Sequence, residues 1–141
     1  MQEEKHISAI KEVDRTVEDA LKGSILDHQR RLTSMISIGI QHLIELYFHR
    51  LHIIKPGAYV KHEWFRMSEK NTKLRLSSII TNDFDKIPQL AEILAIAREI
   101  EKDRNEILYG ASLKDDAILR NKIDEFLEIK KIIEKETGEV T

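Results

Sequence analysis

Four side chains that could bind a metal or exchange protons recur along one stretch of the chain. They are spaced by three, four and three residues: His42, Glu45, His49 and His52. On a helix this spacing forms one polar stripe, and imidazoles beside a carboxylate suit zinc or iron. Di-metal carboxylate bundles, however, carry Glu-x-x-His motifs on paired helices. This sequence has His-x-x-Glu once and no later histidine after residue 62. We therefore interpret the stripe as half-exposed polar groups or interface hydrogen-bonding groups, and expect no metal and no cofactor.

A second candidate is an arginine inside an apolar stripe. Arg104 lies between Ile100 and Ile107 with helical spacing. An arginine in a core is costly unless it is paired or half-exposed. One interpretation places it at the rim of the core, with its head in water or paired with Glu101 or Asp103. The other directs it at an anion in an interface groove, because guanidinium binds phosphate bidentately. Position alone favours the rim.

A third candidate is the connecting segment 55–67, which is rich in aromatic and basic residues. It contains Tyr59, Lys61, His62, Trp64 and Phe65. Such side chains can stack on nucleic-acid bases. Aromatic clusters in connections more often cover the end of a bundle core, and we expect that structural role here.

Composition limits the classes of function. The chain has 141 residues, a net charge of -2, 41% hydrophobic and 34% charged residues, and no cysteine. It therefore has no disulfide, thiolate catalysis or zinc finger, and it is not a strongly basic nucleic-acid protein. No stretch reaches the roughly 20 apolar residues of a membrane span, and the first residues carry no signal-peptide core. We expect one cytoplasmic domain over residues 1–141 without a membrane partner.

Apolar residues recur with the period of a helix almost throughout. The expected helices are a first ending near Gly23, a second over 25–54, a third over 66–80, a fourth from Pro88 to Gly110, and a fifth capped by Ser112 and Asp115. The fold class is all-α, a four- or five-helix bundle with up-down connections. The tail, 135–141, is expected to fray.

The expected helix 25–54 is apolar on more than one side. Its main face contains Ile36, Ile40, Leu43, Ile44, Tyr47, Leu51 and Ile54. Four further apolar residues lie away from that face: Met35, Ile38, Leu46 and Ile53. Such a helix is buried on several sides. Either it contacts a partner or it is central to its own bundle, and the pattern does not choose between the two.

The segment Arg104-Asn105-Glu106-Ile107-Leu108-Tyr109-Gly110 resembles the signature of the HEPN family (higher eukaryotes and prokaryotes nucleotide-binding domains). That signature is an Arg, commonly followed by a polar residue such as Asn, and then a His after four to six residues, late in a long helix. The layout is similar too, with a Glu-containing helix over 40–47 before the motif and an amphipathic helix after it. The resemblance covers most of the chain in layout, but only a few residues in its motif.

The resemblance implies a HEPN-like helical bundle that dimerises. Active members of the family are metal-independent ribonucleases, often toxins, and many are encoded beside a minimal nucleotidyltransferase that neutralises them. The Arg and His of both subunits meet in a cleft at the dimer interface. The expected partners are therefore a second copy, RNA or a nucleotide, and a nucleotidyltransferase. The expected ligand-binding residues are Arg104, Asn105, Tyr109, Glu45 and His49, with Arg104 and Tyr109 as catalytic candidates.

The sequence departs from the signature at its histidine, because position 109 holds a tyrosine. A phenol with an ordinary pKa of about 10 exchanges few protons near neutral pH. We therefore expect a binding module whose RNA-cleaving chemistry is weakened or lost. The alternatives are an active ribonuclease toxin, with Tyr109, His42 or His49 handling protons, and a purely structural helical interaction protein.

Overall fold

The computed structural model describes residues 2–141, and the fold is all-helical as the periodicity predicts. The helices are α1 (Gln2–Lys22), α2 (Gln29–Arg50), α3 (Glu69–Ile79), α4 (Leu90–Glu101), α5 (Arg104–Tyr109) and α6 (Ala117–Thr137), with 3₁₀ turns η1 (Leu26–His28), η2 (His62–Arg66) and η3 (Phe84–Lys86). No strand occurs in this range, where a single antiparallel bridge joins Ile54 to Ile80. Within residues 2–141, none of the helices is both long and apolar enough to cross a membrane.

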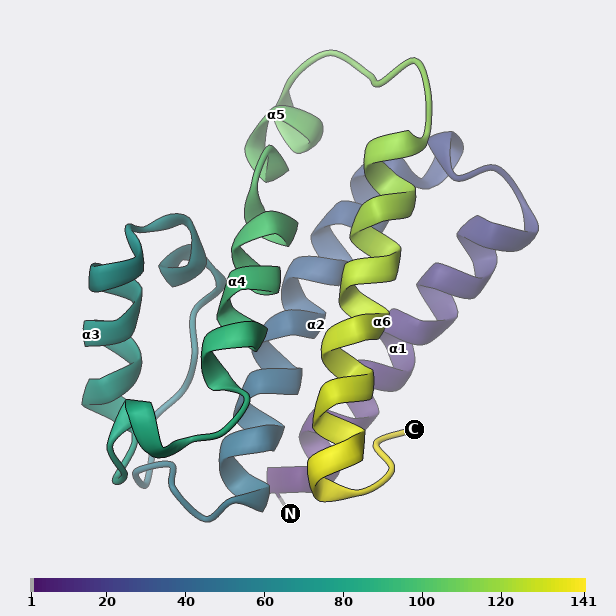
Figure 1. Cartoon of the computed structure of the whole chain (residues 1–141). Helices are drawn as coiled ribbons and strands as arrows, with labels where there is room; N and C mark the ends of the chain where they lie inside the picture. The colour runs from purple at the N-terminus through teal and green to yellow at the C-terminus, as the bar shows by residue number, and fades with distance from the viewer. Residues whose placement is uncertain (1) are drawn as a thin grey trace.

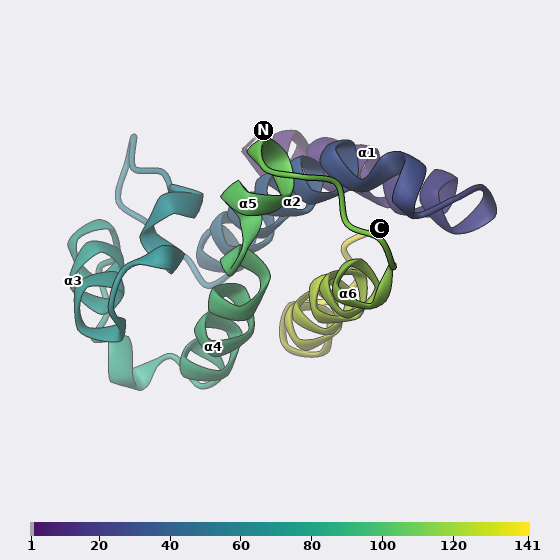
Figure 2. The same cartoon turned by 90° about the horizontal axis from the view of Figure 1, so that it is seen from above.

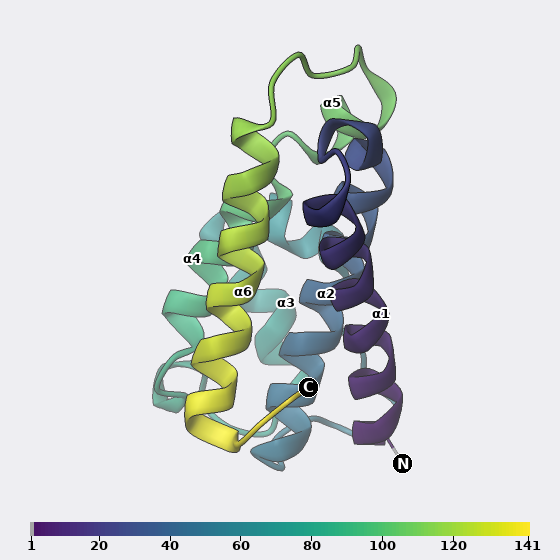
Figure 3. The ribbon, with the colours of Figure 1, turned by 90° about the vertical axis from the view of Figure 1, so that its right-hand side faces the viewer.

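Helices α1, α2, α4 and α6 form the bundle, and the chain direction alternates from each to the next (Figure 1). Helix α2 packs against both α1 and α6, and α6 also packs against α4. Seen from above, α3 stands outside these four helices (Figure 2), where it contacts η2 and η3. Figure 3 shows α6 and α1 on either side of α2.

The central position of α2 explains why it is apolar nearly all round. Leu46 and Ile53, which lie off its main apolar face, are buried inside this chain at 0% and 3% exposure. Met35 is half-buried against the core, and Ile38 remains 38% exposed. Of the two explanations that the pattern left open, the bundle itself accounts for most of this surface.

Helix α2 ends earlier than the sequence predicts, at Arg50 rather than residue 54. His52 adopts a left-handed conformation with φ 57°. The amide of His52 donates to the carbonyl of His49, and the amide of Ile53 donates to the carbonyl of Phe48. These two bonds form the Schellman arrangement that closes a helix, and the buried Ile53 supplies its usual hydrophobic contact.

The expected fourth helix is broken in two, which is a correction to the sequence prediction. Helix α4 ends at Glu101, and α5 begins at Arg104 after Asp103, whose φ is 64°. The buried Nζ of Lys122, from α6, donates to the carbonyl of Ile100 at 2.6 Å and to that of Lys102 at 2.6 Å. The lysine thus satisfies carbonyls that a continuing helix would have bonded, and the short side chain of aspartate tolerates the left-handed turn.

The C-terminal segment does not fray. The guanidinium of Arg50, at the end of α2, donates to the carbonyls of Gly138 at 2.9 Å and Glu139 at 3.0 Å. Val140 is only 4% exposed, and its amide donates to Glu134 at 2.8 Å. The buried Val140, whose backbone amide is hydrogen-bonded, holds this segment against the bundle. The mostly polar composition of 135–141 gives no sign of this contact.

Candidate functional site

A buried carboxylate at the end of α4 lies against side chains from three other elements, η2, α2 and α5. Glu101, the last residue of α4, has a side chain with 0% exposure. Its Oε1 accepts a hydrogen bond from Nδ1 of His62 at 2.7 Å, and its Oε2 accepts one from the hydroxyl of Ser37 at 3.2 Å. Arg104 Nε donates to the same hydroxyl oxygen at 2.9 Å and lies 3.8 Å from Glu101 Oε2. We call these four side chains the Glu101 network.

The Glu101 network is a charge-compensated group rather than an isolated ion. A buried carboxylate without partners would lose several kcal/mol of solvation, but Glu101 has the Arg104 guanidinium and the His62 imidazole on its two oxygens. Both partners are mostly shielded from solvent, with side-chain exposures of 14% for Arg104 and 19% for His62. The pairing of Arg104 with Glu101 at the rim of the core is the first of the two interpretations drawn from its position.

Polar side chains on α2 place His62 against this carboxylate. Gln41 Oε1 accepts from the backbone amide of His62 at 2.9 Å, and Glu45 Oε1 accepts from the backbone amide of Val60 at 2.5 Å. Ser37, Gln41 and Glu45 are four residues apart and therefore share one helix face. That face holds the extended segment before η2, so that η2 starts with His62 at the end of α4.

Helix α5 presents the motif residues in two directions. Arg104 turns back to the Glu101 network, while its Nη1 donates to Oδ1 of the exposed Asn105 at 3.0 Å. Tyr109 points to solvent with 80% exposure, because five residues along a helix rotate a side chain by about 140°. Arg30 of α2 closes the other end of α5, donating to the carbonyl of Gly110 at 3.1 Å. Two arginines therefore bracket α5, with Asn105 and Tyr109 exposed between them.

A second polar group lies where α1 packs against α2. Nδ1 of His6, on α1, is 2.8 Å from Nδ1 of His42, and the rings of His6 and His49 have centroids 5.3 Å apart. Oε2 of Glu45 is 3.1 Å from Nε2 of His6, without the alignment of a hydrogen bond. We call His6, His42, Glu45 and His49 the His6 cluster. The sequence stripe thus contributes to an interface within the chain, whereas His52 takes no part.

Burial governs the electrostatics of the His6 cluster. Desolvation, followed by repulsion from His42, His49 and Lys5, lowers the pKa of His6 to about 4. Burial also lowers the pKa of His42 and, as the largest cause, that of His49. It raises the pKa of Glu45, against the opposing effect of the Val60 hydrogen bond. The surroundings thus disfavour charge on every member.

The predicted ligand-binding residues therefore divide between two places. Arg104, Asn105 and Tyr109 lie on α5, whereas Glu45 and His49 belong to the His6 cluster. Along α2, Ser37 is separated from Glu45 by about 12 Å and from His49 by about 18 Å. Glu45 and His49 also border a surface pocket of about 530 Å³, lined further by Lys5, Ile54, Lys55, Pro56, Gly57, Ala58 and Tyr59.

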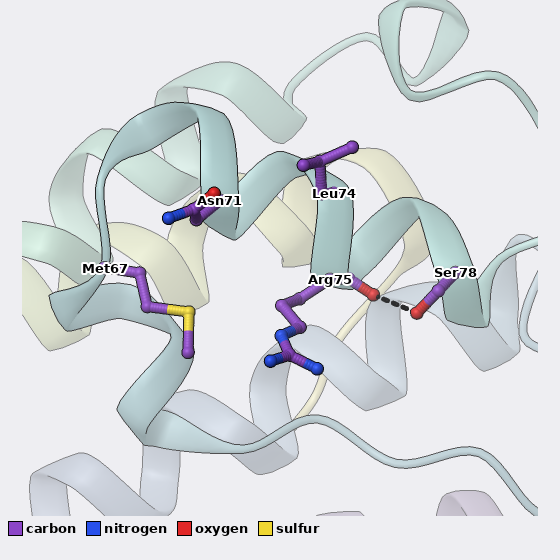
Figure 4. A pocket seen from close by; sticks show the side chains of 5 residues that line it. All are labelled: Met67, Asn71, Leu74, Arg75 and Ser78. Atoms are coloured by element: carbon purple, nitrogen blue, oxygen red, sulfur yellow. Dashed lines mark hydrogen bonds between the residues drawn. The ribbon is translucent and has the colours of Figure 1, made fainter.

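Other surface hollows are lined by residues outside these two groups. The one drawn in Figure 4 lies along the outer side of α3, with a volume of about 480 Å³, and its lining is Met67, Asn71, Leu74, Arg75 and Ser78. Its one charged side chain is Arg75, and the hydroxyl of Ser78 is bonded to the Arg75 carbonyl at 2.6 Å. In the part of the chain that the structure describes, no group of three or more His, Cys, Asp or Glu side chains is arranged to hold a metal ion.

Sequence reasoning missed the pairing of His62 with Glu101 and the contribution of His6. In the sequence, His62 stands only as a member of the aromatic segment 55–67, and His6 lies on a different helix from the stripe that it joins. The aromatic segment itself is mainly structural, since Phe65 is 1% exposed and Trp64 packs against the core. Tyr59 is 58% exposed, with Nζ of Lys61 5.5 Å from its ring centroid. A regular spacing reveals residues on one helix, but not which distant residue folds onto them.

In comparisons with known proteins, no family model, no curated protein and no solved structure matches the chain.

Proposed function

We propose that this chain is a HEPN-like module that binds RNA, or a nucleotide, through phosphate contacts around α5. The observation that carries the proposal is the pair of arginines at the two ends of α5. Arg104 is fixed through Nε on Ser37, and Arg30 is fixed on the carbonyls of Leu108 and Gly110. Guanidinium groups held in this way bind phosphate with little loss of side-chain freedom.

Exposed groups between the arginines suit a nucleic acid. The only hydrogen bonds of Arg104 to the described residues use Nε and Nη1, which leaves Nη2 for an anion. The Asn105 amide lies beside it and can donate as well. Tyr109, at 80% exposure, offers a face on which a base stacks. Because the net charge is -2, binding depends on this local arrangement rather than on a basic surface.

Assembly into a homodimer is the second part of the proposal. It is supported by the resemblance and by two apolar side chains near α5 and on α2 that stay exposed, Tyr109 and Ile38. A stable interface would bury about 1,200 Å² or more. Light scattering at tens of micromolar is expected to give twice the chain mass, and a monomer mass would exclude this part. A minimal nucleotidyltransferase encoded next to this chain is the heterologous partner to test first.

Binding is tested with a fluorescently labelled, mixed-sequence single-stranded RNA at low salt. We expect Arg104→Ala and Arg30→Ala each to weaken binding by about tenfold or more, as loss of a charge-assisted contact implies. Arg120→Ala is the matched control, because Arg120 lies on α6 in an exposed pair with Asp116. Arg30 is exposed and outside the buried network, so Arg30→Ala remains informative if Arg104→Ala unfolds. Unchanged affinity in Arg30→Ala and in folded Arg104→Ala would exclude the proposal.

A further inference from the structure

We propose that the pocket between α3, η3 and α4 binds a free amino acid with an apolar side chain, and that Arg98 binds the carboxylate of this ligand. The pocket has a volume of about 350 Å³ and is lined from all three elements. The proposal is independent of RNA binding, because none of the lining residues belongs to α5, to the Glu101 network or to the His6 cluster.

Two 3₁₀ turns lie against both of the helices that form the pocket. Helices α3 and α4 each pack against η2 and η3, and they run in opposite directions, with η3 in the segment that joins them (Figure 1). Between them, Ala91 and Ala95 of α4 face the pocket, one helical turn apart, and leave space that longer side chains would fill. The volume is at the lower end of the range for small-molecule sites, roughly 300–1,000 Å³. It suits a compact molecule rather than a nucleic-acid strand or a folded partner.

Part of the pocket wall is apolar. Leu94 is 8% exposed, and Phe84 is half-buried against the hydrophobic core. Together with the methyl groups of Ala91 and Ala95, these side chains form a surface against which an aliphatic or aromatic group is removed from water. This surface accounts for the apolar side chain of the proposed ligand.

Arg98 provides a positive charge that has no partner in the chain. Its Nε is buried without a hydrogen-bond partner among residues 2–141, and its guanidinium takes part in none of the ion pairs of that range. A buried donor without an acceptor is unfavourable. A carboxylate matches the planar guanidinium through two parallel hydrogen bonds. Arg98 therefore favours a ligand that carries a carboxylate.

The other cation at the pocket, Lys73, is already engaged. Its Nζ donates to Oδ1 of Asp85 at 3.0 Å and lies 5.1 Å from the centroid of the Phe84 ring. The charges of Lys73 and Asp85 compensate each other, so Arg98 is the cation that is left for a ligand.

Two further carboxylates decide between a simple anion and a zwitterion. Glu69 of α3 and Glu99 of α4 also line the pocket, and neither forms an ion pair within residues 2–141. They would repel a phosphate or another multiply charged anion, whereas a simple amine would be repelled by Arg98. A zwitterion matches both signs of charge, and a free amino acid joins an ammonium and a carboxylate to an apolar side chain.

Binding is tested by titrating isotope-labelled protein with L-leucine and L-phenylalanine and following its amide chemical shifts. We expect saturable shifts at residues of α3, η3 and α4, with affinity in the millimolar range or tighter. Two analogues of phenylalanine separate the charges, because hydrocinnamate lacks the ammonium and phenethylamine lacks the carboxylate. Each should bind more weakly by about tenfold or more, since it leaves a charged group of the pocket unpaired.

Substitutions assign the binding to this pocket. Arg98→Gln keeps a polar side chain without the positive charge and should weaken phenylalanine binding by about tenfold or more. Arg75→Gln is the matched control, because Arg75 lies along the outer side of α3 (Figure 4), and it should leave the affinity unchanged. Glu69→Gln should weaken the binding of phenylalanine but not that of hydrocinnamate. Ala95→Phe, at an exposed position, fills the pocket and should abolish binding in a folded chain.

The amino-acid site is excluded if neither amino acid causes a saturable shift at about 10 mM, or if the shifts are confined to other elements. Equal affinity for phenylalanine and its two analogues would also overturn the proposal, because charge would then play no part in recognition. If Arg98→Gln fails to fold, Ala95→Phe decides: unchanged binding overturns the assignment to this pocket, and lost binding supports it. None of these outcomes depends on RNA binding at α5.

Discussion

The Glu101 network and the His6 cluster each place a buried glutamate beside a histidine, yet the two glutamates have different neighbours. The Glu101 network takes Ser37 from α2 and its other members from η2, α4 and α5, whereas the His6 cluster takes three of its four members from α2. Glu101 has a guanidinium beside it, whereas Glu45 lies beside the His6 imidazole and accepts a hydrogen bond from the Val60 amide. The Glu101 network thus contains a permanent cation, whereas burial disfavours charge on every member of the His6 cluster.

The two groups show that having a glutamate and a histidine does not by itself determine which charges a cluster favours; the neighbouring residues do. A permanent cation beside a buried carboxylate offsets part of the hydration that the carboxylate has lost. In the His6 cluster desolvation is the largest effect: it raises the pKa of Glu45, against Lys5 and the Val60 hydrogen bond, and it lowers the pKa of His6. The proposed phosphate contacts therefore use Arg104, a member of the Glu101 network, whereas we expect acid sensitivity to arise from the His6 cluster.

The largest expected effect is on stability, when each glutamate is removed in turn. Glu101→Ala leaves Arg104 and His62 facing an empty site and should cost about 3–5 kcal/mol of unfolding free energy. Glu45→Ala loses mainly the hydrogen bond from Val60 and should cost about 1–3 kcal/mol. Urea denaturation at pH 7 measures both. Equal costs would contradict the distinction between a paired and an unpaired carboxylate.

Acidification should act mainly through the His6 cluster. The pKa of His6 is about 4 in the folded chain against 6.5 as its ordinary value, so the unfolded chain binds more protons between these limits. Stability is therefore retained above pH 6.5 and lost as the pH falls towards 4, by about 3 kcal/mol for a shift of this size.

The comparison variant for this loss is His6→Leu, which removes the titrating group. The unfolding free energy of His6→Leu should depend less on pH between 6.5 and 4 than that of the unmodified protein. Carboxylates titrate in both proteins and cancel in the difference. Parallel curves would show that His6 does not control the acid response.

A smaller effect is expected where α6 holds the Glu101 network in place. Lys122→Met deprives the carbonyls at the end of α4 of their donor and should cost about 2 kcal/mol. Because those carbonyls fix the start of α5, RNA binding should weaken as well. Arg120→Met, two residues earlier and exposed, should stay within about 0.5 kcal/mol. If Lys122→Met lost stability but not RNA binding, the break between α4 and α5 would not be needed for the proposed binding site.

The smallest stability effect is expected at Tyr109. Its side chain is 80% exposed, so Tyr109→Ala should change the unfolding free energy by less than about 0.5 kcal/mol. RNA affinity should nevertheless fall, by about 1–3 kcal/mol if a base stacks on the ring. Tyr109→Phe keeps the ring and should bind nearly as the original does. Equal affinity in Tyr109→Ala would remove this residue from the interface.

Helical periodicity predicted the fold class, because apolar spacing along each segment directly determines which face is buried. It did not predict the break at Asp103, which depends on Lys122 from α6, or the end of α2 at His52. Of the Glu101 network, the sequence singled out Arg104, but it did not reveal His62, which is 39 residues from Glu101 in sequence. Only the folded chain shows which side chains contact a buried carboxylate such as that of Glu101.

Lys122, which bonds the carbonyls at the end of α4, also couples the local unfolding of α5 to that of α6. Helix α5 has six residues, and an isolated helix shorter than about 12 residues is marginal in water. Its start depends on carbonyls capped from α6. We expect the amides of α5 to exchange with deuterium only when α6 undocks, so that both segments open as one cooperative unit.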